Sequence, residues 1–154
     1  VHGSRGLGDV YKRQIIDLGS GGGLPGIPLA ITHPSKHFCL VESNTKKSSF
    51  LLNTTSRLNL ENTTVLNKRI EDIGQEDLPE EYDIVCRAVG ATDLIISFTK
   101  KHLQLPGVSL KLMKTSEQFD NEEIPAGYRV KEIEKFDSKA KDKTRILVTI
   151  EAER

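Results

Sequence analysis

The chain has 154 residues, enough for one domain that buries about 70% of the surface its unfolded form exposes. Its 22 basic and 22 acidic residues cancel, so any contact with nucleic acid depends on local patches of charge. No apolar run approaches ~18 residues and the two cysteines lack metal-ligand spacing, so we expect a cytoplasmic protein with no membrane span, no metal site and reduced, buried thiols.

Residues 1–14 form a glycine-rich, basic leader without helical or strand periodicity. We expect this leader to be disordered or foreign to the domain that follows it. An alternative is that Arg5, Lys12 and Arg13 form a phosphate-binding arm. The predicted domain therefore comprises residues 15–154.

Residues 15–31 begin with an apolar run typical of a strand, pass through a glycine-rich turn and end in an apolar run that predicts a helix. The glycines of the turn are Gly19, Gly21, Gly22 and Gly23. Glycines permit positive φ and let a ligand approach the backbone, and the unpaired N–H groups of the new helix face the same place. The stretch therefore predicts a binding site for a small polar cofactor.

Two cofactor fingerprints overlap in this loop. Gly21, Gly23 and Gly26 match the G-x-G-x-x-G spacing of dinucleotide folds, in which a pyrophosphate lies on the helix N-terminus. Asp17, which closes the strand just before Gly19, instead suits a cationic group such as an amino-acid ammonium. The acid and glycines together favour S-adenosylmethionine. Binding of a dinucleotide remains the alternative interpretation of the glycines. A purely structural role, in which Asp17 only stabilises the turn through its hydrogen bonds, remains the alternative for that residue.

A second strand is expected at residues 37–41, after a helix that His33 and Pro34 should end. Glu42 follows this strand, close to the ~20-residue interval after the glycines at which an acid reaches a ribose hydroxyl. The two oxygens of its carboxylate can accept both ribose hydroxyls. A solvated glutamate at the end of a strand is the alternative, and the glycine loop favours the ribose role.

The rest of the chain alternates between helices and strands. Asn44 or Thr45 can cap a helix through about Leu58. The stripe of this helix that we expect in the core is Phe50, Leu51, Thr54, Thr55 and Leu58. Further strands are expected at 63–67, 82–86, 108–113, 128–136 and 145–150, a helix at 91–103, and a short polar helix or loop at 118–121. We expect His102 at the surface and a solvated hairpin connection at 137–144.

The loop at residues 17–30 reads Asp-Leu-Gly-Ser-Gly-Gly-Gly-Leu-Pro-Gly-Ile-Pro-Leu-Ala. It closely resembles the cofactor loop of the RsmG (GidB) family, bacterial methyltransferases that act on guanine N7 of small-subunit ribosomal RNA. The Leu-Pro-Gly-Ile-Pro-Leu extension makes the match specific, because generic methyltransferases share only the acid and the glycines. The similarity continues at residues 40–43, 58–62, 69–72, 87–88 and 112–114.

The resemblance implies an α/β fold with the doubly wound, Rossmann-like sheet of class I methyltransferases, mostly parallel with an antiparallel C-terminal strand pair. The cofactor-binding residues expected from the loop and from the resemblance are Asp17, Gly19, Gly21, Leu24, Glu42, Ile70, Glu71 and Arg87. Within this set, Ile70 is expected to pack on the adenine. Arg87 has two further roles open to it, bracing the loop or holding RNA through its planar guanidinium.

Guanine N7 carries a lone pair and no proton, so methyl transfer to it needs alignment rather than a catalytic base. We therefore expect no catalytic acid or base, and Cys86 belongs to its strand instead of acting as a nucleophile. Lys114 aligns with a lysine that the family keeps near its substrate cleft, so we expect it to contact a phosphate or the guanine of the RNA. For Arg87 the cofactor is the favoured ligand and the RNA is the second choice.

The expected partner is small-subunit ribosomal RNA or the 30S particle, bound by a monomer. The resembled family has an N-terminal helical region before its glycine loop, and without a counterpart to it the chain looks truncated at the N-terminus. Two other functions stay open: a nicotinamide-dependent oxidoreductase that uses the shifted glycine frame, and a non-catalytic fragment that only binds RNA.

Overall fold

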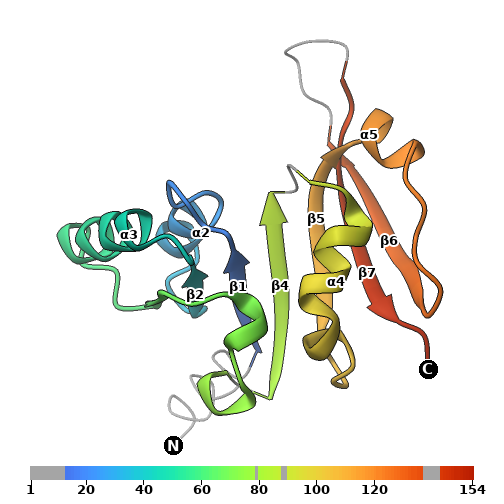
Figure 1. Cartoon of the computed structure of the whole chain (residues 1–154). Coiled ribbons are helices and arrows are strands. Elements are labelled where there is room, and N and C mark those ends of the chain that lie inside the picture. The colour runs from blue at the N-terminus through green and yellow to red at the C-terminus, as the bar shows by residue number, and fades with distance from the viewer. Residues whose placement is uncertain (1–12, 79, 88–89, 137–142) are drawn as a thin grey trace, which may run out of the picture. The chain divides into compact units, whose positions relative to one another are not determined.

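The computed structural model describes residues 13–78, 80–87, 90–136 and 143–154 (Figure 1). The strands are β1 (Arg13–Leu18), β2 (Phe38–Val41), β3 (Thr63–Leu66), β4 (Glu81–Arg87), β5 (Ser109–Thr115), β6 (Tyr128–Phe136) and β7 (Arg145–Ala152). The helices are α2 (Gly26–Thr32), α3 (Thr45–Arg57), α4 (Thr92–Leu103) and α5 (Ser116–Asp120), with short 3-10 turns η1 (Ile70–Asp72) and η2 (Gln75–Asp77).

These strands form one seven-stranded sheet in the order β3-β2-β1-β4-β5-β7-β6. The pairs β1–β2 and β2–β3 are parallel, whereas β7 runs antiparallel to both β5 and β6. The expected α/β class with a closing antiparallel pair is therefore confirmed. The chain divides into two compact units, residues 1–84 and 85–154.

The first unit is organised around β2, which is buried along its whole length. Parallel strands covered on both faces read as continuous apolar runs, and the Phe-Cys-Leu-Val sequence of β2 does so. Its core cluster consists of Ile27, Ala30, Phe38, Leu40 and Leu51. Burial, with a smaller contribution from Asp77, raises the pKa of the Cys39 thiol to about 12, so this free cysteine stays protonated at neutral pH.

Helix α3 begins where the sequence indicated, because Asn44 Oδ1 accepts a hydrogen bond of 3.0 Å from the N–H of Lys47. The predicted core stripe is only partly right. Its apolar members Phe50 and Leu58 are 51% and 48% exposed. The buried face consists of Ser48, Leu51 and Thr55. Thr55 can occupy that face because its Oγ1 donates to an acceptor inside the helix, the Leu51 carbonyl, at 2.9 Å.

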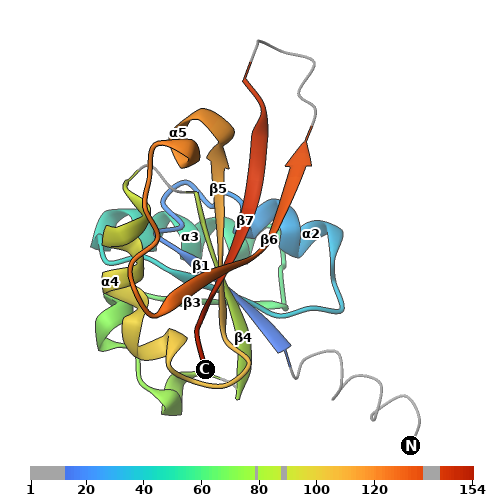
Figure 2. The same cartoon turned by 90° about the vertical axis from the view of Figure 1, so that its right-hand side faces the viewer.

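In the second unit, β6 and β7 run side by side as an antiparallel pair with an irregularity between Val130 and Glu132 (Figure 2). The side chains of Leu110, Leu112, Val148 and Ile150 are fully buried. His102 is also buried, so its expected place at the surface is wrong. It follows Ile95 and Thr99 at helical spacing, and both of these residues lie on the buried face of α4.

Strand β1 begins two residues before the expected domain boundary, at Arg13. The Arg13 guanidinium pairs with the Asp83 carboxylate at 2.6 Å, and its part in a phosphate-binding arm stays a prediction. Arg5 and Lys12 and the hairpin connection at 137–142 lie outside the described residues. None of the helices in the described part of the chain is long and apolar enough to cross a membrane.

Candidate functional site

The glycine turn packs against the end of the neighbouring strand. The N–H groups of Gly19 and Ser20 both donate to the Val41 carbonyl, at 2.9 and 3.1 Å. Gly19, Gly21 and Gly23 have φ of 66°, 53° and 89°, a region that side-chain-bearing residues rarely adopt. The backbone geometry of the turn therefore requires glycine at these three positions.

Asp17 ties this turn to the start of α2. Its side chain is 1% exposed, and its Oδ2 accepts hydrogen bonds from Ser20 Oγ at 2.8 Å and from the Gly26 N–H at 2.9 Å. Gly26 is the first residue of α2, so the carboxylate satisfies one of the N–H groups that a helix leaves unpaired. Asp17 thus stabilises the turn, which is one of the two roles expected for it. Its contact with the ammonium group of a ligand stays a prediction.

Glu42 lies against the glycine turn, as the carboxyl ends of adjacent parallel strands predict. Its Oε1 accepts from the Gly21 N–H and its Oε2 from the Asn44 N–H, both at 2.9 Å. A carboxylate oxygen can accept more than one hydrogen bond, so both oxygens keep capacity for ligand hydroxyls. Asn67, which no sequence signal marked, holds this corner by donating to the Glu42 carbonyl at 2.9 Å.

The other residues expected at the cofactor in the first unit differ in exposure. Leu24 is 48% exposed in the loop before α2 and is open to a ligand. Glu71 is exposed in η1. Ile70 is only 3% exposed, because η1 turns its side chain into the interior instead of leaving it on a surface loop. Its packing on an adenine therefore stays a prediction.

The residues expected at the substrate belong to the second unit. Arg87 is exposed as the last residue of β4. Lys114 on β5 is buried instead, and its Nζ donates to the Gly90 carbonyl at 3.1 Å and to the Glu122 carboxylate at 2.5 Å. The Lys114 ammonium is thus engaged inside the protein. Glu122 lies in a polar segment without periodicity, so no signal in the sequence marked it.

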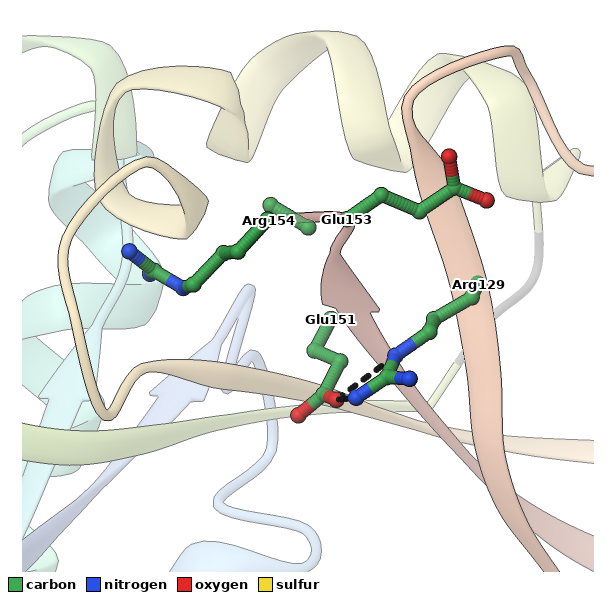
Figure 3. A pocket seen from close by; sticks show the side chains of 5 residues that line it. Arg129, Glu151, Glu153 and Arg154 are labelled. Carbon is green, nitrogen blue, oxygen red and sulfur yellow. Dashed lines mark hydrogen bonds and ion pairs between the residues drawn. The ribbon is translucent and has the colours of Figure 1, made fainter.

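A separate pocket of about 430 Å³ lies beside the ends of β6 and β7 (Figure 3). It is lined by Arg129, Glu151, Ala152, Glu153 and Arg154. Arg129 forms an ion pair with Glu151, and the Arg154 guanidinium donates to the Leu105 carbonyl at 2.8 Å. Its arginines are already engaged with groups of the protein, so this pocket does not compete with the glycine turn as the candidate site.

Solved methyltransferases share the fold of this chain. The magnesium protoporphyrin IX methyltransferase of Synechocystis with bound SAM superposes with a TM-score of 0.63 at 15% identity, covering 94% of this chain and 73% of that one. TrmK of M. capricolum in complex with S-adenosyl-homocysteine gives a TM-score of 0.63 at 11% identity, covering 98% and 67%. At such identities the likeness shows the fold alone.

Sequence comparison is more specific. The family model for rRNA small subunit methyltransferase G, GidB, matches residues 7–147. The ribosomal RNA small subunit methyltransferase G of Syntrophomonas wolfei is 34% identical over 152 residues, covering 95% of this chain and 71% of the relative. That of Xanthomonas campestris is 41% identical over 145 residues, covering 92% and 66%. The chain thus spans about two thirds of the length of these relatives, and it belongs to the rRNA small subunit methyltransferase G family.

Proposed function

We propose that this chain binds S-adenosylmethionine and transfers its methyl group to guanine N7 of small-subunit ribosomal RNA. The observation that carries the proposal is the hydrogen bond of 2.9 Å between the Gly21 N–H and Glu42 Oε1. It joins a glycine turn of positive φ to a carboxylate that retains acceptor capacity, which fits an adenosine whose ribose lies at the Glu42 carboxylate. Membership in the rRNA small subunit methyltransferase G family supports the reaction and the substrate.

Each part of the site has a distinct task in this proposal. Glu42 accepts the ribose hydroxyls, and the backbone around Gly19 and Gly21 lets the ligand approach closely because glycine has no side chain to stand in the way. Leu24, Ile70 and Glu71 serve the adenosine end. When bound, S-adenosylmethionine supplies an electrophilic methyl group on a sulfonium.

The protein's contribution to the methyl transfer is alignment. N7 of guanine has an in-plane lone pair and no proton to lose, so no side chain needs to act as a base. Arg87, exposed at the end of β4, binds the carboxylate of the methionine moiety or, alternatively, an RNA phosphate. We also infer that the protein acts as a monomer without a metal ion, in the cytoplasm, where ribosomal subunits are its substrate.

Ligand-induced stabilisation tests the cofactor. At a concentration of about 100 times Kd, S-adenosylhomocysteine should stabilise the chain by about 2.7 kcal/mol and raise Tm by about 5 °C or more. NAD at the same concentration should leave Tm unchanged in differential scanning fluorimetry. The reverse pattern would support the oxidoreductase that uses the shifted glycine frame and would refute the proposal.

Replacement of Arg87 by alanine should lower methyl transfer about tenfold or more while Tm stays within about 1 °C of wild type, because an exposed side chain contributes little to folding. The assay is transfer of a tritiated methyl group to small subunits from a strain that lacks the modification. A rise in Kd for S-adenosylhomocysteine assigns Arg87 to the cofactor, and a rise in KM for the subunit assigns it to RNA.

Arg57→Ala, which removes an exposed arginine at the end of α3, is the matched control and should keep full activity. Full activity of Arg87→Ala as well would remove Arg87 from the site. If the folded wild-type chain bound the subunit but incorporated no label, the non-catalytic RNA-binding function would be favoured.

A further inference from the structure

Lys114 and Glu122 connect three segments of the second unit. Lys114 Nζ, on β5, donates to the Gly90 carbonyl at 3.1 Å and to Glu122 Oε1 at 2.5 Å. Glu122 Oε2 accepts from the Thr92 N–H at 2.8 Å. The pair thus holds Gly90 and Thr92, the first residue of α4, against the end of β5.

The pair also supplies what the start of α4 lacks. The N-cap residue Ala91 has no side chain that can accept from the first turn, and the Glu122 carboxylate takes over that task from a distant part of the sequence. Burial opposes ionisation of Glu122, but hydrogen bonds from Lys114 and Thr92 outweigh it and lower the pKa of Glu122 below its ordinary value. Glu122 is therefore charged at neutral pH, as a partner of a buried ammonium must be.

These contacts argue against a direct role of Lys114 at RNA. Its side chain is 2% exposed, and binding a phosphate would require the ammonium to leave both the Gly90 carbonyl and the Glu122 carboxylate. The separation of an ion pair of which one partner is buried is costly. The effect of Lys114 on a bound ligand is therefore transmitted through the protein.

We propose that Lys114 and Glu122 form a positioning pair that fixes the chain from Gly90 to Thr92, and with it Arg87 at the preceding strand end, for methyl transfer. The inference rests on the proposed function, in which Arg87 contacts the cofactor or the RNA. Because that reaction depends on alignment rather than on an acid or base, a shift of this segment lowers kcat without removing a ligand contact.

Lys114→Met and Glu122→Gln, made in the full chain, test the pair. Each should lower kcat about tenfold, while KM for the small subunit and Kd for S-adenosylhomocysteine stay within about twofold of wild type. The double variant should be no worse than Lys114→Met, because the two groups act as one unit. Exchange of the Thr92 amide hydrogen should be faster in both single variants. Glu122→Gln retains the shape of the side chain and serves where Lys114→Met fails to fold.

Lys111→Met on the same strand and Glu123→Gln beside Glu122 are the matched controls, and both should keep wild-type kcat. A raised KM with a flatter salt dependence in Lys114→Met alone would assign Lys114 to an RNA phosphate and overturn the proposal. So would a lower Tm with unchanged kcat, which marks a merely structural pair. A wild-type chain that neither binds S-adenosylhomocysteine nor transfers methyl groups would refute the proposed function instead. In that case, an unchanged exchange rate of the Thr92 amide hydrogen in the two variants would still refute the positioning pair.

Discussion

Replacement of Glu42 by alanine is expected to weaken binding of S-adenosylhomocysteine by at least about tenfold, because two charge-assisted hydrogen bonds to the ribose are lost. Glu42 is 7% exposed, and the Gly21 N–H donates to its Oε1 at 2.9 Å, so the carboxylate is held in place before the ligand binds. Isothermal titration calorimetry measures the loss. Glu61→Ala, which removes an exposed glutamate of the same unit, should bind as wild type does.

A loss of affinity on its own does not separate ribose binding from bracing of the loop, since Glu42 also accepts from Gly21 and Asn44. A comparison of two ligands that differ only in a ribose hydroxyl separates these two roles of Glu42. Wild type should prefer S-adenosylhomocysteine over its 2′-deoxy analogue by about tenfold, and Glu42→Ala should bind the two ligands almost equally. Equal discrimination by the variant and the wild type would limit Glu42 to holding the turn and would contradict the ribose role.

The turn and Glu42 were predictable because their determinants are local. A strand followed by glycines has few ways to turn into a helix, and the ends of adjacent parallel strands meet at one edge of a sheet. The sequence therefore predicted that Gly21 and Glu42 lie together, although they are 21 positions apart. The family resemblance added the substrate and the nucleobase, which the chemistry of the loop does not specify.

The sequence is least informative where a distant group decides the environment of a residue. Lys114 was expected to offer its ammonium to the RNA, but in the structure that ammonium donates hydrogen bonds to the Gly90 carbonyl and the Glu122 carboxylate. Ile70 looked like part of a loop, but the 3-10 turn η1 buries it. Asn62 lies within 3.1 Å of the carbonyls of Ala30, His33 and Lys36, so one side chain fixes the end of α2 without any periodic signal. Such long-range polar contacts are set by tertiary packing and leave no local pattern.

The match of this loop to the dinucleotide spacing also has a physical explanation, which centres on Gly26. A Cβ atom at Gly26 would lie 2.3 Å from Leu40 Cδ2 and 2.6 Å from Asp17 Oδ2. Leu40 is fully buried in β2, and Asp17 Oδ2 is the atom that accepts from the Gly26 N–H. Glycine is needed here for close packing of α2 on the strands, the same task that the third glycine performs in dinucleotide folds. The third glycine of the shared spacing therefore reflects a packing requirement, whichever nucleotide binds.

Gly26→Ala should accordingly destabilise the fold by about 3 kcal/mol, a large part of the roughly 5–15 kcal/mol typical of a domain, and lower Tm by about 5 to 10 °C. The new methyl group must displace either a core leucine or the carboxylate that caps α2. Gly22→Ala is the control in the same turn, because a Cβ atom there would meet no atom of the described residues within 4 Å beyond its chain neighbours, and its φ is not positive. Urea unfolding should place Gly22→Ala within about 0.5 kcal/mol of wild type. Equal stabilities of the two variants would mean that α2 has room to move away from β2, and close packing would then no longer account for the glycine.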